Sequence, residues 1–98
     1  MAGKTKALIV DDSSLMRKAV RKIFEASNKI EVSGEAENGK EALSLLKEHD
    51  VDFVISDLNM PVLDGEMLLK WMKAGIHGLD LLFLQIDSMT TLILILNI

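Results

Sequence analysis

Short apolar runs and amphipathic segments alternate along the first three quarters of the chain. Residues 7–10 (ALIV) are continuously apolar, which is typical of a strand covered on both faces. Residues 15–24 then carry apolar side chains at helical spacing, with four basic residues that we expect to form a solvent-exposed face. Helical spacing also follows residues 30–34, which alternate and suit a partly exposed strand, and residues 52–56, which are predicted to form the third strand. The pattern therefore predicts three successive strand–helix units.

Capping residues mark where the predicted helices begin. Ser13 or Ser14 can accept a hydrogen bond from a free amide in the first turn of the first helix. Residues 38–39 (NG) suit either a hairpin turn or a helix cap, and the helical spacing of the apolar residues after them favours the cap. Asp64 is the corresponding cap for a third helix.

The order of these elements predicts an α/β fold. Short strands separated by helices cannot pair as hairpins, so they form a parallel sheet through helical crossovers. The chain of 98 residues has room for one domain with a modest core. In open parallel sheets, sites form beyond the carboxyl ends of the strands, where the strand order reverses.

Carboxylates follow two of the three predicted strands. Asp11 and Asp12 come directly after the first strand, and Asp57 comes after the third. If these strands are neighbours, each pair of like charges roughly 5 Å apart costs about 3 kcal/mol at an effective dielectric constant of about 20. Raised pKa values or a bound cation must relieve this repulsion. A site with only oxygen ligands and room for water suits Mg²⁺.

Composition restricts the other classes of function. The formal net charge of −4 disfavours nucleic acid as a partner, and the absence of cysteine excludes disulfides and thiolate metal sites. The basic segment 1–6 precedes too short an apolar run to act as a signal peptide. The apolar run 92–96 is far shorter than the ~20 residues that a membrane span needs, so no membrane anchor is expected.

Three separate motifs together resemble one family. They are residues 8–13 (LIVDDS) with 16–17 (MR), residues 38–43 (NGKEAL), and residues 57–61 (DLNMP) with 64–65 (DG). This set is similar to the receiver domain of two-component response regulators, and within it to the chemotaxis type: the single-domain motor regulator or the receiver of the methylesterase. The resemblance implies a flavodoxin-like, doubly wound parallel sheet of order 2-1-3-4-5.

The resemblance also implies a role for each acid. Asp57 would accept a phosphoryl group from a histidine kinase or phosphotransfer protein. Asp12 and Asp57 would ligate Mg²⁺ directly, the backbone carbonyl of Asn59 would be a further ligand, and Asp11 would hold metal-bound water. This agrees with the chemistry, because phosphoryl transfer depends mainly on positioning and charge neutralisation.

Pro61 and Gly65 are assigned to positioning of the loop after the third strand. Pro61 restricts Met60 to extended conformations, which helps to fix the loop that carries the carbonyl of Asn59. Gly65 follows the capping residue Asp64, and this dipeptide is equally compatible with an ordinary turn.

The predicted receiver core is residues 1–73, of which the resemblance covers roughly residues 5–73. It is followed by a divergent apolar tail, residues 74–98, that contains no lysine or arginine. Five strand–helix units would need roughly 120 residues, so we expect an incomplete sheet: three units, a fourth strand and an uncertain remainder. Residues 81–86 and 92–96 are the candidates for one or two edge strands, or the tail self-associates with another chain. The uncharged run 92–96 is also an aggregation hazard.

Two features of the receiver family depend on this tail. The family carries a lysine after the fifth strand, and no residue is available for that place. It also carries a serine or threonine after the fourth strand; Ser88 or Thr90 lies near the expected position, and Ser88 is the candidate, although neither has the usual sequence context.

The leading hypothesis is a cytoplasmic phosphorelay receiver, phosphorylated at Asp57 with Mg²⁺, with no enzymatic activity beyond its own phosphorylation and dephosphorylation. One alternative is an interaction module that holds no lasting phosphate, and another is a curtailed fragment with no independent role. The missing lysine favours the alternatives, whereas the acidic pocket favours the first hypothesis.

Overall fold

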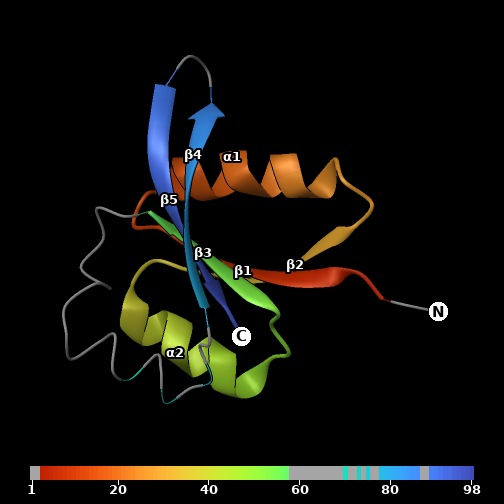
Figure 1. Ribbon diagram of the computed structural model, residues 1–98, viewed down its shortest axis with the longest axis vertical. Helices are drawn as coiled ribbons and strands as arrows, with labels where there is room; N and C mark the ends of the chain where they lie inside the picture. Colours follow the sequence, from red (N-terminus) through yellow and green to blue (C-terminus); the bar gives the residue numbers. More distant parts are fainter. Residues whose placement is uncertain (1–2, 58–69, 71–72, 74, 76–77, 87–88) are drawn as a thin grey trace.

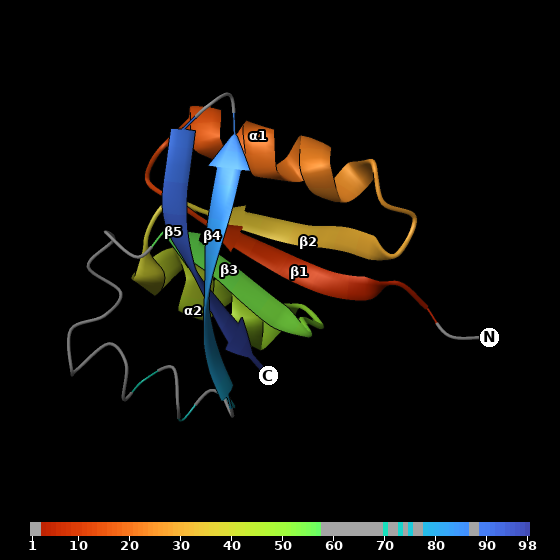
Figure 2. The same cartoon turned by 45° about the horizontal axis from the view of Figure 1, so that its top comes forward.

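The computed structural model describes residues 3–57, 70, 73, 75, 78–86 and 89–98 (Figure 1). Its elements are β1 (Thr5–Val10), α1 (Ser14–Glu25), β2 (Ile30–Ala36), α2 (Gly39–Glu48), β3 (Phe53–Asp57), β4 (Gly78–Ile86) and β5 (Met89–Asn97). The strands form one sheet in the order β2-β1-β3-β5-β4. Figure 2 shows α1 and α2 on opposite faces of this sheet, which confirms the doubly wound α/β arrangement.

Both described helices begin at the predicted capping residues. The hydroxyl of Ser13 accepts a hydrogen bond from the amide of Met16 at 3.2 Å, which starts α1. Asn38 Oδ1 accepts one from the amide of Glu41 at 2.8 Å, which starts α2. Each bond satisfies an amide that has no partner within its own helix. The cap at Asn38 is confirmed over the hairpin turn.

The first three strands form the predicted parallel sheet. β1 lies in the middle and pairs in parallel with β2 on one side and β3 on the other. The register places Leu8 opposite Val54 and Val10 opposite Ser56. The connection from β1 to β2 passes through α1, and the connection from β2 to β3 passes through α2. The three strands therefore point the same way, and their carboxyl ends lie on the same side of the sheet.

Alternate residues of β1 and β3 fill two separate cores. On the α2 face, the buried residues are Leu8, Val10, Ala36, Ala42 and Val54. On the α1 face, they are Ile9, Val20 and Ile55, with Phe24 and Phe53 packed beside them in an edge-to-face contact. Successive strand residues point to opposite faces, so a sheet covered on both sides needs a continuous apolar run, as residues 7–10 provide.

The tail departs from the expected parallel order. β4 and β5 form an antiparallel pair, and β5 is also antiparallel to β3, with Ile95 opposite Ile55. The order 2-1-3-4-5 is therefore wrong beyond β3, since β5 lies between β3 and β4, and of the two tail strands β4 is the one at the edge. The short connection accounts for the antiparallel pairing of β4 with β5: two residues separate these strands, whereas a parallel connection needs a crossover of about a dozen residues or more.

None of the helices in the described part of the chain is long and apolar enough to cross a membrane.

Candidate functional site

Two of the predicted site acids lie at the same edge of the sheet. Val10 of β1 pairs with Ser56 of β3, and the next residue along each strand is an aspartate, Asp11 or Asp57. Because β1 and β3 are adjacent and parallel, both acids lie at the carboxyl ends of these two strands, on the same side of the sheet. The structure therefore brings together residues that are far apart in the sequence.

Asp11 is a buried acid with two acidic neighbours. Only 5% of its surface is exposed, its amide donates to the carbonyl of Ala36, and its Oδ1 accepts a hydrogen bond from the amide of Ser13 at 2.9 Å. Burial raises the pKa of Asp11 above its ordinary value; the hydrogen bond from Ser13 opposes this, and the negative charges of Asp57 and Asp12 add to it. The ionised form of Asp11 is thus disfavoured unless a positive charge compensates it.

The remaining acids are more accessible. Asp12 is exposed and Asp57 is half-buried. Within residues 3–57 and the described parts of the tail, no three acidic or histidine side chains come close enough to hold a metal ion by themselves. The predicted cluster of three carboxylates is therefore more open than expected.

The donor set nevertheless fits Mg²⁺. Asp11, Asp12 and Asp57 offer only carboxylate oxygens, which are the hard ligands that this ion prefers. Mg²⁺ usually takes one or two carboxylates and keeps several waters, so it does not require a closed protein cage. The burial of Asp11 beside two further negative charges supplies an electrostatic reason for a cation to bind there.

An ion-pair network fixes the backbone next to these acids. Arg17 Nη1 donates to the backbone carbonyl of Asp11, and Arg17 Nε lies 3.3 Å from Glu35 Oε1 on β2. Arg21 holds the other oxygen of Glu35, with Nη2 2.6 Å from Oε2, and its Nη1 pairs with Glu25 at 3.2 Å. The guanidinium of Arg17 thus links the carbonyl that precedes Asp12 to the neighbouring strand.

The sequence had suggested that all four basic residues of α1 face solvent. Lys18 and Lys22 do so, but Arg17 and Arg21 turn toward Glu35. The sequence did indicate that the two arginines act together, because they are four residues apart and therefore lie on the same side of the helix. Burial raises the cost of charging Arg21, yet its bonds to Glu35 and Glu25 leave its pKa above the ordinary value.

Several predicted site residues lie outside the described part of the chain. These are Asn59, Pro61, Gly65 and Ser88. Thr90, the alternative to Ser88, lies on β5 three positions before Ile93, which pairs with Asp57. At about 3.3 Å per residue, Thr90 is about 10 Å along the strand from the level of Asp57.

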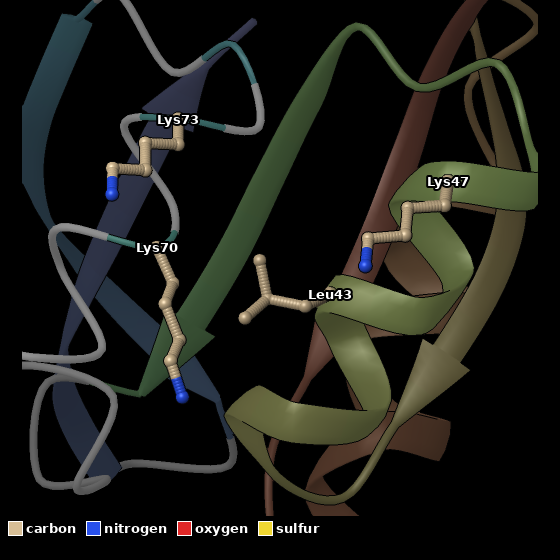
Figure 3. A pocket seen from close by; sticks show the side chains of 4 residues that line it. All are labelled: Leu43, Lys47, Lys70 and Lys73. Atoms are coloured by element: carbon tan, nitrogen blue, oxygen red, sulfur yellow. The ribbon is translucent and has the colours of Figure 1, made fainter.

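A hollow of about 240 Å³ lies beside α2. Figure 3 shows Leu43 and Lys47 of α2 on one side and Lys70 and Lys73 on the other. Its described lining offers three ammonium groups and no carboxylate, so it does not provide the ligands of a Mg²⁺ site.

Comparison with known proteins agrees with this geometry. Residues 7–94 match the family of the response regulator receiver domain. The chain is 45% identical over 65 residues to the protein-glutamate methylesterase/protein-glutamine glutaminase of Methanococcoides burtonii, covering 66% of this chain and 18% of that protein. It is 43% identical over 75 residues to the chemotaxis protein CheY of Halobacterium salinarum, covering 74% of this chain and 61% of that protein.

Solved structures show the same fold. The crystal structure of the P1 domain of CheA3 in complex with CheY6 from R. sphaeroides matches with a TM-score of 0.62 and 34% identity, covering 68% of this chain and 52% of that one. The RcsB response regulator of Salmonella typhimurium matches with a TM-score of 0.63 and 28% identity, covering 76% and 38%.

The chain spans under a fifth of the length of the methylesterase relative and about three fifths of the CheY relative. The family match nevertheless extends over most of the chain, and the chemotaxis-type relatives agree with the resemblance seen in the sequence motifs. The protein therefore belongs to the response regulator receiver domain family.

Proposed function

We propose that this receiver accepts a phosphoryl group on Asp57 from a histidine kinase or phosphotransfer protein, with Mg²⁺ as cofactor. The observation that carries the proposal is the register of β1 and β3, which sets the buried Asp11 beside Asp57 at the carboxyl edge of the sheet. Receivers of this family are signalling domains, and the proposal assigns this chain the same place in a phosphorelay.

In the proposed transfer, a carboxylate oxygen of Asp57 attacks the phosphorus of a phosphohistidine. A new O–P bond forms, the P–N bond breaks, and its electron pair returns to the imidazole nitrogen of the donor. Asp57 is half-buried at the end of β3, so a donor side chain can approach it while the strand holds its backbone in place. Positioning of this kind is the main protein contribution to phosphoryl transfer.

The metal would be held by the carboxylates of Asp12 and Asp57 and the backbone carbonyl of Asn59, with Asp11 holding metal-bound water. When bound, Mg²⁺ would neutralise charge on the phosphoryl oxygens. Asp11 contributes a buried negative charge at a fixed position, since Ser13 hydrogen-bonds its carboxylate and Arg17 hydrogen-bonds its carbonyl. Fixed charges of this kind bind a cation without reorganising first.

The proposed partner is a phosphotransfer domain or kinase in the cytoplasm. One structural relative was crystallised in complex with a P1 domain of CheA3, which supports this class of partner. Leu15, in the first turn of α1, is 77% exposed and follows the acidic loop by three residues, so an apolar contact is available next to the site. We propose no enzymatic activity beyond the receiver's own phosphorylation and dephosphorylation, and no contact with nucleic acid or membrane.

One alternative is an interaction module that holds no lasting phosphate. It is favoured by the composition of the tail, where residues 74–98 contain no lysine that could contact a phosphoryl group. The structure places β5, in antiparallel orientation, next to β3 on the side where a parallel fourth strand was expected.

Intact-mass spectrometry after incubation with Mg²⁺ and a small phosphodonor distinguishes the two functions. We expect the wild type to gain the mass of one phosphoryl group. Asp57→Asn should show no gain, whereas Asp50→Asn, which changes a side chain that is 94% exposed, should behave like the wild type. A sample that is folded by circular dichroism and gains no phosphoryl group would refute phosphoacceptance and favour the interaction module.

A further inference from the structure

β4 is the last strand of the sheet on the side opposite β2. Within the described part of the chain it pairs with β5 on one side only. Its ladder with β5 runs without a shift from Gly78 opposite Asn97 to Ile86 opposite Met89. Among the described residues, no strand pairs with the backbone N–H and C=O groups on the outer side of β4, and a regular row of such groups is a template for another strand.

The sequence of β4 carries little of the usual protection of an edge strand. Proteins commonly block such edges with charged residues, especially lysine, with proline or with a β-bulge. β4 reads GLDLLFLQI, with Asp80 as its one charged residue, no lysine and no proline, and no bulge interrupts its register.

The opposite edge of the sheet is protected. β2 carries Glu31 and Glu35, and its register with β1 shifts between Ala7 and Leu8. Glu35 is also held by Arg17 and Arg21 of α1. Strand addition is therefore favoured at β4 and disfavoured at β2.

We propose that β4 pairs with β4 of a second copy of this chain, antiparallel and around a two-fold axis at Leu82. In this register all nine residues of β4 find a partner: Gly78 faces Ile86, Asp80 faces Leu84, and Leu82 faces its own copy. The interface is independent of the proposed phosphorylation. It would join two five-stranded sheets into one continuous sheet.

The strand is compatible with itself in this register. The two Asp80 residues lie four positions apart, which is about 13 Å at about 3.3 Å per residue, so no like charges oppose each other. A two-fold interface uses the same strand from both copies and leaves only the protected β2 edges at the two ends. The pairing therefore closes at a dimer rather than continuing into a fibre.

Cysteine substitution tests both the dimer and its register, because the chain contains no cysteine of its own. Leu82→Cys places two thiols at directly opposed positions, where Cα atoms in antiparallel strands lie about 4.5–5.5 Å apart. That separation is within the range of a disulfide, about 4.4–6.8 Å. We expect Leu82→Cys to form a covalent dimer under mild oxidation, and a reductant should reverse it.

Two matched variants serve as controls. In Gln85→Cys the thiols of the two copies would lie six positions apart, about 20 Å, so β4 pairing in this register cannot join them. Glu31→Cys places the thiol on the protected β2 edge, at an exposed position. Neither should give a covalent dimer at the concentration where Leu82→Cys does, as read from non-reducing electrophoresis and intact mass.

Sedimentation velocity of the wild type provides a test without any substitution. We expect a reversible shift from monomer to dimer as concentration rises, and Leu82→Lys should move that shift to at least tenfold higher concentration. Circular dichroism of each variant checks that it is folded like the wild type. A wild type that stays monomeric throughout, equal cross-linking of Leu82→Cys and Gln85→Cys, or cross-linking through Glu31→Cys would each overturn the proposal.

Discussion

Replacing Arg17 with methionine removes the link between the acidic loop and β2. The Arg17 side chain is 17% exposed and makes two polar contacts, one with the carbonyl of Asp11 and one with Glu35 at 3.3 Å. Methionine keeps the apolar stem of the side chain and loses both contacts, so packing changes little. The variant therefore isolates the polar contribution of the guanidinium.

The expected loss follows from the exposure of the two contacts. A hydrogen bond from a charged donor contributes about 1.5–3 kcal/mol, and a partly exposed ion pair contributes about 1 kcal/mol or less. Solvent reaches part of the network and Arg21 still holds Glu35, so we expect the lower part of this range, a loss of about 2 kcal/mol in the free energy of unfolding. For a chain of this size, that lowers Tm by about 8–16 °C.

Urea unfolding followed by circular dichroism measures this loss. Lys18→Met is the matched control, because Lys18 is exposed on the same helix and the change should stay within about 0.5 kcal/mol. In a Glu35→Gln background, Arg17→Met should cost less than in the wild type, since one of its contacts is already weakened. If Arg17→Met unfolds at the same urea concentration as Lys18→Met, the network does not stabilise the loop.

Three further measurements test the site and the core. Burial raises the pKa of Asp11 in the folded state, so the contribution of Asp11 to stability becomes less favourable as pH rises from the unfolded-state pKa, about 3.9, through the folded-state value. At pH 7, Asp11→Asn should therefore unfold at a higher urea concentration than the wild type, and this difference should vanish in acid. Millimolar Mg²⁺ should raise the Tm of the wild type and of Asp50→Asn but have less effect on Asp57→Asn, because a ligand that binds only the folded state stabilises the folded state. An equal rise in Tm for all three proteins would place the ion elsewhere. Leu8 is fully buried, so Leu8→Ala should lower the free energy of unfolding by about 2–5 kcal/mol. Leu15 is 77% exposed, so Leu15→Ala should change the free energy of unfolding by less than about 0.5 kcal/mol. Similar losses for the two variants would contradict the assigned core.

The part of the fold that the sequence predicted has strong periodicity. The continuous apolar run at residues 7–10 required cover on both faces, and Leu8 and Ile9 indeed point into separate cores under α2 and α1. The helix starts at Ser13 and Asn38 were predictable because capping is local chemistry between residues three apart. That Asp11 and Asp57 share an edge depended on β1 and β3 being neighbours, and the strand order that makes them neighbours came from the resemblance to receiver domains.

The direction of the tail strands was not predictable in the same way. The residues of β4 and β5 are apolar without a clear period, so the sequence indicates strands but not which neighbour each one takes or in which direction. The contacts of Arg17 with Glu35 and Asp11 were missed for a related reason. They join α1, β2 and the loop after β1, and a surface-like pattern on one helix does not reveal an acid on another element.

The antiparallel orientation of β5 changes what can reach Asp57. A parallel strand beside β3 would end at the same edge and deliver the loop after it to the site. β5 instead passes Asp57 at Ile93, so residues 89–92 continue beyond the carboxyl end of β3, together with residues 83–86 of β4 that pair with them. Thr90 and Thr91 are therefore carried about 7–10 Å along the strand from the level of Asp57.

A positive charge beside Asp57 must then come from a source other than the described tail, whose residues include no lysine or arginine after Lys73. Arg17 is already engaged by Glu35 and by the carbonyl of Asp11. A bound cation would offset the charges of Asp11, Asp12 and Asp57 and would favour the ionised form of Asp11, whose pKa is raised without it. For this reason the difference in Mg²⁺ response between the wild type and Asp57→Asn is a direct measure of whether the acidic pocket works as a metal site.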